Sequence, residues 1–421
     1  MKKVLIISFY FPPCNLTASQ RAYDWAKNFK HFNIDPIILT RNWDISIKEP
    51  KDVHLKSGTE KTYTQNKEFK AVILPYKASF YDQLILTNKL PLFQKTVTLI
   101  RKLSVFKPIL LNPYNEFYKE AARIIKNENI SGIIVTGAPF ELFYIGYKLN
   151  KKYNIPWIAD YRDDWSTNEV LKYNIVEKIL LKFNKFCEKK WIKRSSCITS
   201  ISKHYTKKIS IFTKKSGYVI ENGFNEYISN PHTQNDLFTI IYNGTLYKSQ
   251  PVEIFLEAFC EFSKDKDNVE LKFIGAGYDL SQKNRLLKYK SRLNNKLIVT
   301  NRIERKEVIE EQKKASLLLM ISHQNCKGIP SSKLYEYFSL GKNILSFPPD
   351  FDILDEKLNE YELGKICSNR IEIINYLNKL YDDYSQEKLL KIETPNENYF
   401  ISRHFRYNQT KQMSEICKKY F

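Results

Sequence analysis

Short apolar runs alternate with amphipathic stretches along almost the whole chain, in two successive series. The first series predicts strands at 4–9, 36–40, 133–136, 156–161 and 197–201, with its clearest helix at 19–32. The second predicts strands at 238–243, 270–275, 297–300, 316–322, 343–347 and 364–367. Such alternation is typical of βαβ units in a parallel sheet with helices on both faces. The pattern therefore predicts two consecutive α/β domains.

A polar segment separates the two series. Residues 221–236 contain Asn222-Gly223 and Asn230-Pro231 but few apolar side chains, a composition typical of a hinge loop. The final helical stretch, 400–420, follows a polar break centred on Pro395, so we expect it to pack away from its own domain. The predicted divisions are an N-terminal domain at 1–221, a linker at 222–237, a second domain at 238–395 and a C-terminal helix at 396–421.

Positive charge is concentrated in the first half of the chain. The 421 residues include 67 Lys and Arg against 46 Asp and Glu, a net charge of +21. Residues 1–220 hold 38 of the basic and 18 of the acidic residues, so nearly all of the excess lies there. A charge of this size favours an anionic partner, such as a nucleotide, a lipid headgroup or a nucleic acid.

Several classes of protein are disfavoured by what the sequence lacks. Gly275-x-Gly277 is followed by Leu280 where a dinucleotide-binding motif needs glycine, and no P-loop motif occurs. The seven cysteines have no CxxC spacing and the six histidines no HExxH motif, so we expect no metal site and a reducing compartment. The apolar run after Lys3 ends at Pro12 and fits a first buried strand better than a signal peptide. No apolar stretch reaches the roughly 20 residues of a membrane span, so we expect a cytoplasmic protein.

Residues 78–111 form an unusual basic and apolar segment. Leucine, isoleucine and phenylalanine are interleaved with Lys89, Lys95, Arg101 and Lys102, and no acid occurs between Asp82 and Glu116. A basic amphipathic helix can lie on an anionic bilayer with its lysines on lipid phosphates. The segment is equally consistent with a solvated amphipathic helix packed on its own domain.

The clearest local motif of the second half runs from Gly328 to Phe338, directly after a predicted strand. Ser331 and Ser332 are residues typical of a helix start, which places a helix N-terminus at the carboxyl edge of the sheet. Free backbone N–H groups and the charge of Lys333 make that terminus suitable for a diphosphate. Glu336 lies three residues further on the same helix face, where a carboxylate can accept both hydroxyls of a ribose. The alternative is an ordinary Lys333–Glu336 surface pair.

In the first half, a predicted strand runs directly into the charged cluster Asp160-Tyr161-Arg162-Asp163-Asp164. Charges beside a buried strand end are costly to desolvate unless they pair or bind a ligand. The cluster is therefore either an internal ion pair of Arg162 with an aspartate or a polar substrate site.

Two further loops follow predicted strands. The segment after Pro13 leads through Thr17 into a helix, with Arg21 able to reach a phosphate. At the start of the second domain, Gly244-Thr245 and Lys248 follow a strand, and glycine there permits close backbone approach to a ligand. A tight turn is the alternative for the Gly244 loop.

Seven motifs in order resemble those of one enzyme family over nearly the whole chain. They are Phe11-Pro12-Pro13 with Arg21, 159–165, Ser200-Ile201-Ser202, 219–224, 242–247, Phe273-Ile274-Gly275, and 333–337 followed by Gly341-Lys342. Together they resemble bacterial glycosyltransferases of GT-B fold, in the large retaining group (family 4-like) that builds cell-surface polysaccharides such as lipopolysaccharide and capsule.

The resemblance implies two Rossmann-like domains facing a central cleft, with a last helix that crosses back to the first domain. It implies a nucleotide-diphosphate-sugar as co-substrate, no metal, and a hydroxyl on a lipid-linked or cell-surface glycan as acceptor. The implied donor-binding residues are Glu336, Lys333, Ser332, Ser331, Gly244, Thr245, Lys248 and Asn222. The implied residues on the acceptor and sugar side are Asp160, Arg162, Asp163, Arg21 and Thr17, and those nearest the chemistry are Asp163, Arg162 and Lys333.

The chain departs from the family pattern at three positions. Gly328 stands where many members have a glutamate, Thr245 where they have an arginine, and Pro251 where they have a lysine. Lys248 and Lys333 are the expected substitutes for the missing phosphate-binding cations. Two other functions fit parts of the pattern: a nucleotide-sugar epimerase of the same fold, and a non-catalytic protein that binds a polyanion.

We thus expect a glycosyltransferase that needs no nucleic acid and works at the inner face of the cytoplasmic membrane. The basic charge of the first domain, including segment 78–111, is expected to attach it peripherally to that anionic surface.

Overall fold

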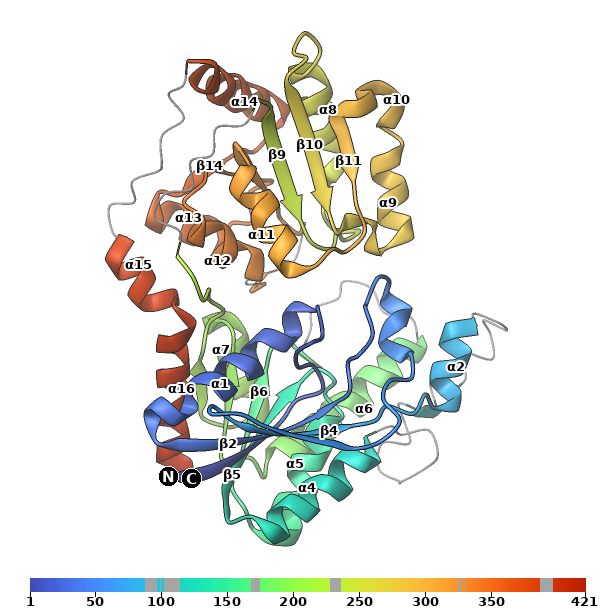
Figure 1. Ribbon diagram of the computed structural model, residues 1–421, viewed down its shortest axis with the longest axis vertical. Coiled ribbons are helices and arrows are strands. Elements are labelled where there is room, and N and C mark those ends of the chain that lie inside the picture. The colour runs from blue at the N-terminus through green and yellow to red at the C-terminus, as the bar shows by residue number, and fades with distance from the viewer. Residues whose placement is uncertain are drawn as a thin grey trace. The chain divides into compact units, whose positions relative to one another are not determined.

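The protein forms two compact units, each built on a mainly parallel sheet (Figure 1). The computed structural model describes residues 1–87, 97, 98, 100, 101, 114–167, 175–227, 236–324, 327–329, 331–386 and 397–421. Unit 1 comprises 1–47, 51–221 and 406–421, and unit 2 comprises 48–50 and 222–405.

Unit 1 contains an eight-stranded sheet of order β3-β4-β2-β1-β5-β6-β7-β8, in which only β3 is antiparallel to its neighbour. Its strands are β1 (Lys2–Ile7), β2 (Ile34–Arg41), β3 (Thr62–Gln65), β4 (Lys70–Leu74), β5 (Ile130–Gly137), β6 (Trp157–Tyr161), β7 (Cys197–Ser200) and β8 (Gly217–Val219). The central strands are apolar and buried on both faces, as expected of strands covered by crossover helices.

The helices of unit 1 follow these strands in βαβ order. They are α1 (Gln20–Asn28), α2 (Phe80–Thr87), α4 (Asn115–Asn127), α5 (Leu142–Tyr153), α6 (Ile175–Ile192), α7 (Lys203–Thr213) and α16 (Arg406–Tyr420), with short 3-10 helices at Thr17–Ser19, Phe29–Phe32 and Pro50–His54.

Unit 2 contains a six-stranded, fully parallel sheet of order β11-β10-β9-β12-β13-β14. Its strands are β9 (Phe238–Asn243), β10 (Val269–Ile274), β11 (Leu297–Val299), β12 (Leu317–Ile321), β13 (Ile344–Phe347) and β14 (Gly364–Ile366). Its helices are α8 (Val252–Phe262), α9 (Leu280–Leu287), α10 (Lys290–Leu293), α11 (Arg305–Lys314), α12 (Ser332–Ser339), α13 (Ile353–Tyr361), α14 (Arg370–Ser385) and α15 (Glu397–His404), with 3-10 helices at Ala276–Tyr278 and Asn294–Lys296.

Two apolar cores lie on opposite faces of the unit 2 sheet. Ile240 packs in a cluster with helices α8, α9 and α14, whereas its neighbour Ile241 packs with α12 and α13. Successive side chains of a strand point to opposite faces, so β9 contributes to both cores. The sheet is therefore covered by helices on both faces, and the loops that follow its strands lie at its edge.

The predicted fold class, two parallel-sheet Rossmann-like domains, is confirmed. Sequence reasoning missed β3, β4 and β8: β3 is fully exposed and polar, β4 is a short apolar run that ends before Pro75, and β8 has three residues. The helix predicted at 19–32 is a 3-10 turn, α1 and a second 3-10 turn.

The single C-terminal helix predicted at 396–421 is divided into α15 and α16. On α15, Phe400 and His404 pack against Tyr361 within unit 2. On α16, Met413, Ile416 and Cys417 enter the core of unit 1, beside Trp25. The chain breaks its helix at Phe405 because the apolar residues on either side belong to different cores.

Two predicted segments lie largely outside the described residues. Of the basic segment at 78–111, the structure describes 78–87, 97, 98, 100 and 101. Within that part, the Arg101 guanidinium lies 4.2 Å from the centroid of the Tyr81 ring. Of the linker at 222–237, residues 228–235 lie outside the described ranges.

Candidate active site

The carboxyl edge of the unit 2 sheet gathers most of the predicted donor-binding residues. Strands β9, β10, β11 and β12 are parallel neighbours, so the loops that follow them meet at one edge. These loops begin at Gly244, Gly275, Thr300 and Ser322, and α12 starts beside them. In open α/β sheets this edge is where ligands bind.

Lys333, on the first turn of α12, reaches into the loop after β9. Its Nζ donates a hydrogen bond of 2.6 Å to the Tyr242 hydroxyl, lies 4.0 Å from the centroid of that ring, and is 3.4 Å from the carbonyl oxygen of Thr245. A Cβ on Gly244 would stand 2.8 Å from Lys333 Cε, and Gly244 has φ of +97°. The glycine is thus required both by its backbone conformation and by the path of the lysine.

The environment of Lys333 lowers the pKa of its ammonium group. Burial and, to a smaller extent, the nearby positive charge of Arg302 lower the pKa of Lys333 to about 7, while Glu336 opposes the shift. An ammonium in this setting is stabilised by an anion that replaces lost water and offsets the second cation. The site therefore favours a negatively charged ligand.

Arg302, in the loop after β11, is a second cation at this edge that sequence reasoning missed. Its NH2 group donates a hydrogen bond of 2.8 Å to the Thr245 hydroxyl, and its guanidinium lies 4.1 Å from the centroid of the Tyr278 ring. The sequence feature that could have indicated Arg302 is its position two residues after the predicted strand 297–300. Lys248, which we expected to substitute for the family's arginine, is instead exposed, and its ammonium contacts none of the described residues.

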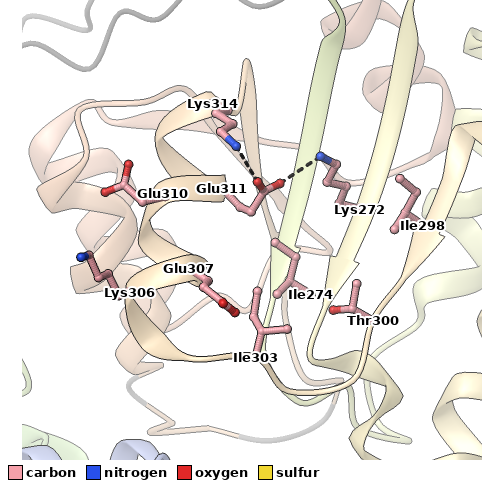
Figure 2. A pocket seen from close by; sticks show the side chains of 10 residues that line it. All are labelled: Lys272, Ile274, Ile298, Thr300, Ile303, Lys306, Glu307, Glu310, Glu311 and Lys314. Atoms are coloured by element: carbon pink, nitrogen blue, oxygen red, sulfur yellow. Dashed lines mark hydrogen bonds and ion pairs between the residues drawn. The ribbon is translucent and has the colours of Figure 1, made fainter.

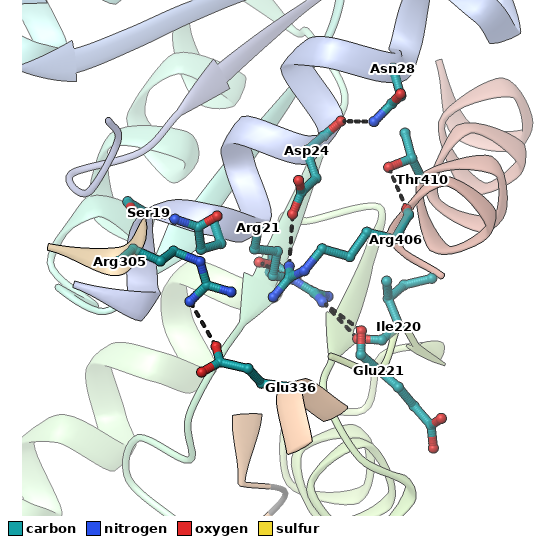
Figure 3. A network of polar contacts seen from close by, with 12 residues as sticks. Ser19, Arg21, Asp24, Asn28, Ile220, Glu221, Arg305, Glu336, Arg406 and Thr410 are labelled. Atoms are coloured by element: carbon teal, nitrogen blue, oxygen red, sulfur yellow. Dashed lines mark hydrogen bonds and ion pairs between the residues drawn. The ribbon is translucent and has the colours of Figure 1, made fainter. Parts of the chain in front are cut away.

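Glu336 lies one helical turn beyond Lys333 and has partners from two other elements, strand β9 and helix α11. Its Oε1 accepts hydrogen bonds from Asn243 Nδ2 at 3.2 Å and Gln312 Nε2 at 2.8 Å, and its Oε2 is 2.8 Å from Arg305 NH1 (Figure 3). The side chain is 15% exposed. The alternative of a plain surface pair with Lys333 is wrong, because each of the two side chains is directed to partners on other elements.

The other predicted donor residues line the same edge or lie nearby. Ser331 and Ser332 are half-buried at the start of α12, and Ser331 caps the helix with its carbonyl oxygen, which accepts from Leu334 N at 3.2 Å. Asn222 is half-buried at the first residue of unit 2's long segment. His323, just after β12, was not predicted; its Nδ1 lies 2.7 Å from the Ser249 hydroxyl of the β9 loop.

In unit 1, Arg21 and Asp160 form a buried ion pair. Arg21 NH2 lies 2.8 Å from Asp160 Oδ1, and its NH1 donates to the carbonyl oxygen of Ile220 at 2.7 Å (Figure 3). Asp160 also accepts from the Thr199 hydroxyl at 2.7 Å and has no exposed surface. These contacts tie α1 to strands β6 and β7, so both charges have internal partners, and a role of the two residues toward the acceptor or a phosphate stays a prediction.

The rest of the charged cluster after β6 has separate partners. Arg162 donates to the carbonyl oxygens of Gly137 at 3.0 Å and Ala138 at 2.7 Å, so its guanidinium holds the loop after β5. Asp164 is buried and pairs with Lys208 at 3.0 Å. Asp163 is exposed and makes no hydrogen bond or ion pair with the described residues. Of the predicted acceptor-side carboxylates, only Asp163 is thus available to a substrate; the hydroxyl residue Thr17 is exposed as well.

Unit 1 also buries a carboxyl group that the sequence did not single out. Glu188 of α6 is fully buried and accepts from the Tyr161 hydroxyl at 3.0 Å and from Ser166 N at 3.2 Å. Burial raises the pKa of Glu188 to about 7, although both hydrogen bonds oppose the shift.

A cavity of about 550 Å³ lies between α11 and the strands β10 and β11 (Figure 2). Its floor is apolar and its rim carries charges of both signs. It is lined by Lys272, Ile274, Ile298, Thr300, Ile303, Lys306, Glu307, Glu310, Glu311 and Lys314. The α11 residues that contact Glu336 are Arg305 and Gln312, which lie on the opposite side of the helix from the lining residues. The cavity is thus separated from the Glu336 site by α11.

Among the residues that the structure describes, no three histidine, cysteine, aspartate or glutamate side chains are grouped so as to hold a metal ion. None of the described helices is both long enough and apolar enough to cross a membrane.

Part of the chain matches a known protein family. Residues 224–396 match the family described as glycosyl transferases group 1. A search with the sequence finds no match among curated proteins.

Solved structures of GT-B architecture resemble the whole chain. Sucrose-phosphate synthase from Thermosynechococcus elongatus superposes with a TM-score of 0.64 at 11% identity, covering 100% of this chain and 99% of its own. HepE from Anabaena, in complex with UDP and glucose, gives a TM-score of 0.59 at 12% identity and covers 100% of both chains. The UDP-forming α,α-trehalose-phosphate synthase from Burkholderia vietnamiensis gives 0.61 at 9% identity, again over 100% of both chains. The chain therefore has the GT-B fold, and its residues 224–396 are similar to the glycosyl transferases group 1 family.

Proposed function

We propose that the protein is a glycosyltransferase that moves a sugar from a nucleotide-diphosphate-sugar to a hydroxyl of a lipid-linked or cell-surface glycan. The observation that carries this proposal is the meeting of Lys333, Arg302 and Glu336 at one edge of the group 1 domain. Two cations suit a diphosphate, and a carboxylate with several exchangeable partners suits the hydroxyls of a ribose.

In this proposal, Lys333, Arg302 and the N-terminus of α12 bind the diphosphate, with Ser331, Ser332 and the Gly244-Thr245 backbone around it. Glu336 exchanges part of its contact with Arg305 and Gln312 for the ribose hydroxyls. A binding site that gives up internal hydrogen bonds for equivalent ones to a ligand discriminates against ligands that lack those hydroxyls.

The chemical step follows from the charge that develops on the departing group. The bond from C1 to the diphosphate oxygen breaks, and the acceptor oxygen bonds to C1 from the same face and releases its proton to the departing diphosphate. Lys333 and Arg302 stabilise the negative charge on that diphosphate, which is electrostatic catalysis that requires no metal. We assign Asp163, which is exposed, the role of orienting the acceptor hydroxyl, and Arg162 that of holding the loop after β5.

We further propose that the acceptor is presented at the cytoplasmic face of an anionic membrane, which the basic first half of the chain would bind peripherally. Reversing the charges of Lys95, Arg101 and Lys102 should then weaken binding to anionic vesicles while donor affinity is retained.

A thermal-shift panel of UDP-, GDP-, ADP- and dTDP-sugars tests the donor site directly. A ligand that binds only the folded protein raises its melting temperature. Among the structural neighbours, the synthase from Burkholderia vietnamiensis is UDP-forming and HepE was solved with UDP bound, so UDP-sugars are the first choice. We expect a rise with at least one donor that is lost in Lys333→Ala and Glu336→Ala, and transfer nearly abolished in both. No rise with any nucleotide-sugar would contradict the proposal.

Incubating the responsive donor without an acceptor separates the proposal from an epimerase. A glycosyltransferase leaves the donor sugar's configuration intact, whereas an epimerase produces its isomer. Salt-sensitive binding to nucleic acid without donor binding would instead indicate a polyanion-binding protein.

A further inference from the structure

Helices α6 and α7 of unit 1 present large apolar side chains to solvent. Ile179 and Phe186 on α6 are 54% and 56% exposed, and Ile211 on α7 is 68% exposed. Ile179 and Phe186 are seven residues apart, so they lie on one side of the helix. The opposite side of α6 is buried, with Cys187 and Trp191 in the interior.

The same two helices carry a dense positive charge. Residues 175–215 contain eleven lysines and one arginine against two glutamates, a net charge of +10. One of the glutamates, Glu188, is fully buried and so offers no charge at the protein surface. This stretch therefore supplies about half of the excess charge of residues 1–220.

The lysines and the apolar side chains share one surface. Lys182, Lys189, Lys190 and Lys193 are exposed, and their spacing of three, four and seven residues from Ile179 or Phe186 places them around those side chains. We call Ile179, Lys182, Phe186, Lys189, Lys190, Lys193 and Ile211 the α6–α7 face.

Contacts between lysines and aromatic rings connect the two helices within this face. Lys190 Nζ lies 5.5 Å from the centroid of the Phe186 ring on its own helix. Lys189 Nζ lies 4.7 Å from the centroid of the Phe212 ring, on α7 next to Ile211. The lysine stems thus lie along apolar surface while their ammonium groups stay in water.

We propose that the α6–α7 face docks on an anionic lipid bilayer. Exposed isoleucine and phenylalanine gain free energy by entering the boundary between headgroups and acyl chains, and the surrounding lysines gain by contacting lipid phosphates. A nucleic acid would satisfy the lysines but would leave the two isoleucines in water. The proposal uses residues outside segment 78–111 and does not depend on the glycosyltransferase activity.

Vesicle binding by the full chain provides the test. We compare sedimentation with vesicles of phosphatidylcholine alone and of phosphatidylcholine mixed with phosphatidylglycerol. Because lysines near an anionic surface strengthen binding to it, reversing three lysines of the α6–α7 face, Lys182, Lys189 and Lys193, to Glu should weaken binding to the mixed vesicles at least about tenfold. The double variant Ile179→Ser/Phe186→Ser should weaken it as well, with its net charge unchanged.

A charge-matched control uses three exposed lysines on other parts of unit 1. Reversing Lys67, Lys77 and Lys126 gives the same net charge, and this variant should bind the mixed vesicles several-fold more tightly than the Lys182 triple variant. Melting temperature and donor binding report whether each variant is folded and whether the nucleotide site is intact.

Three results would overturn the proposal. The first is an equal loss of binding to the mixed vesicles in the two triple variants, which would mean that only the total charge of the protein matters. The second is unchanged vesicle binding in the Ile179→Ser/Phe186→Ser variant, which would mean that no apolar side chain enters the bilayer. The third is tighter binding to duplex DNA than to mixed vesicles, with the same dependence on Lys182, Lys189 and Lys193.

Discussion

The ammonium of Lys333 donates to the hydroxyl of Tyr242 at 2.6 Å and lies over the same ring. A tyrosine hydroxyl is a neutral acceptor, and burial raises the pKa of Tyr242 well above its ordinary value, so it stays neutral. The contact positions the lysine without neutralising it. Lys333 is therefore oriented at the β9 loop, and a bound anion would add to the weak attraction that Glu336 already supplies.

The first prediction concerns pH. The pKa of Lys333 is lowered to about 7, so in the free protein its charge is lost as the pH rises through that value. Binding a diphosphate favours the charged form, so donor binding should take up a proton and weaken as the pH rises above 7, by up to about tenfold per unit. Calorimetry in buffers of different ionisation enthalpy measures this uptake.

The matched variant is Lys333→Met, which fills similar space without a titratable group. It should bind the donor weakly and with little pH dependence between pH 6 and about 9. Equal pH dependence in wild type and variant would show that another group titrates.

The second prediction separates two cations near the β9 loop. Arg302→Ala should weaken donor affinity at least about tenfold, since a charge-assisted hydrogen bond to phosphate is worth about 1.5–3 kcal/mol. Lys248→Ala removes an exposed lysine of the same loop and should change affinity less than about twofold. Titration of both variants with the responsive nucleotide-sugar compares them, and the reverse order would restore Lys248 as the phosphate-binding residue.

These two cations also show what sequence can and cannot predict here. The strand at 238–243 has the predicted bounds, and Lys333 and Glu336 have the predicted edge position, because apolar periodicity and helix-start residues are local signals. Arg302 was missed because its contact with Thr245 joins residues 57 positions apart through the packing of β9, β10 and β11.

Asp160 shows the opposite difficulty, a charged residue whose internal partner the sequence did not identify. A charged residue at a strand end resembles a site residue in sequence, yet here it pairs with Arg21, 139 positions away. Burial of a charge depends on whether a distant segment supplies its partner, and a single sequence does not carry that information.

The third prediction uses two glycines of the carboxyl edge. Gly244 and Gly275 both have positive φ, +97° and +80°, so alanine is strained at either position, by about 1 kcal/mol or more. Only at Gly244 would the new Cβ also collide with Lys333 Cε; at Gly275 the nearest atom, Gly244 Cα, is 3.6 Å away.

Both alanine variants should therefore lose stability in urea denaturation, whereas Gly244→Ala alone should lose most of its donor affinity. If Gly275→Ala lost as much affinity as Gly244→Ala, backbone strain rather than displacement of Lys333 would be the cause.

The fourth prediction separates stability from catalysis in unit 1. Asp160→Asn removes the charge that pairs with buried Arg21, and an uncompensated buried charge costs about 3–5 kcal/mol. The variant should thus unfold at much lower urea concentration.

Asp163→Asn changes an exposed side chain, so the free energy of unfolding should change by less than about 0.5 kcal/mol. If Asp163 orients the acceptor hydroxyl, however, kcat should fall at least about tenfold in Asp163→Asn with donor affinity unchanged. Full activity in this variant would remove Asp163 from the acceptor site. Thr17 and Arg162 would then be the remaining predicted acceptor-side residues with solvent-exposed surface.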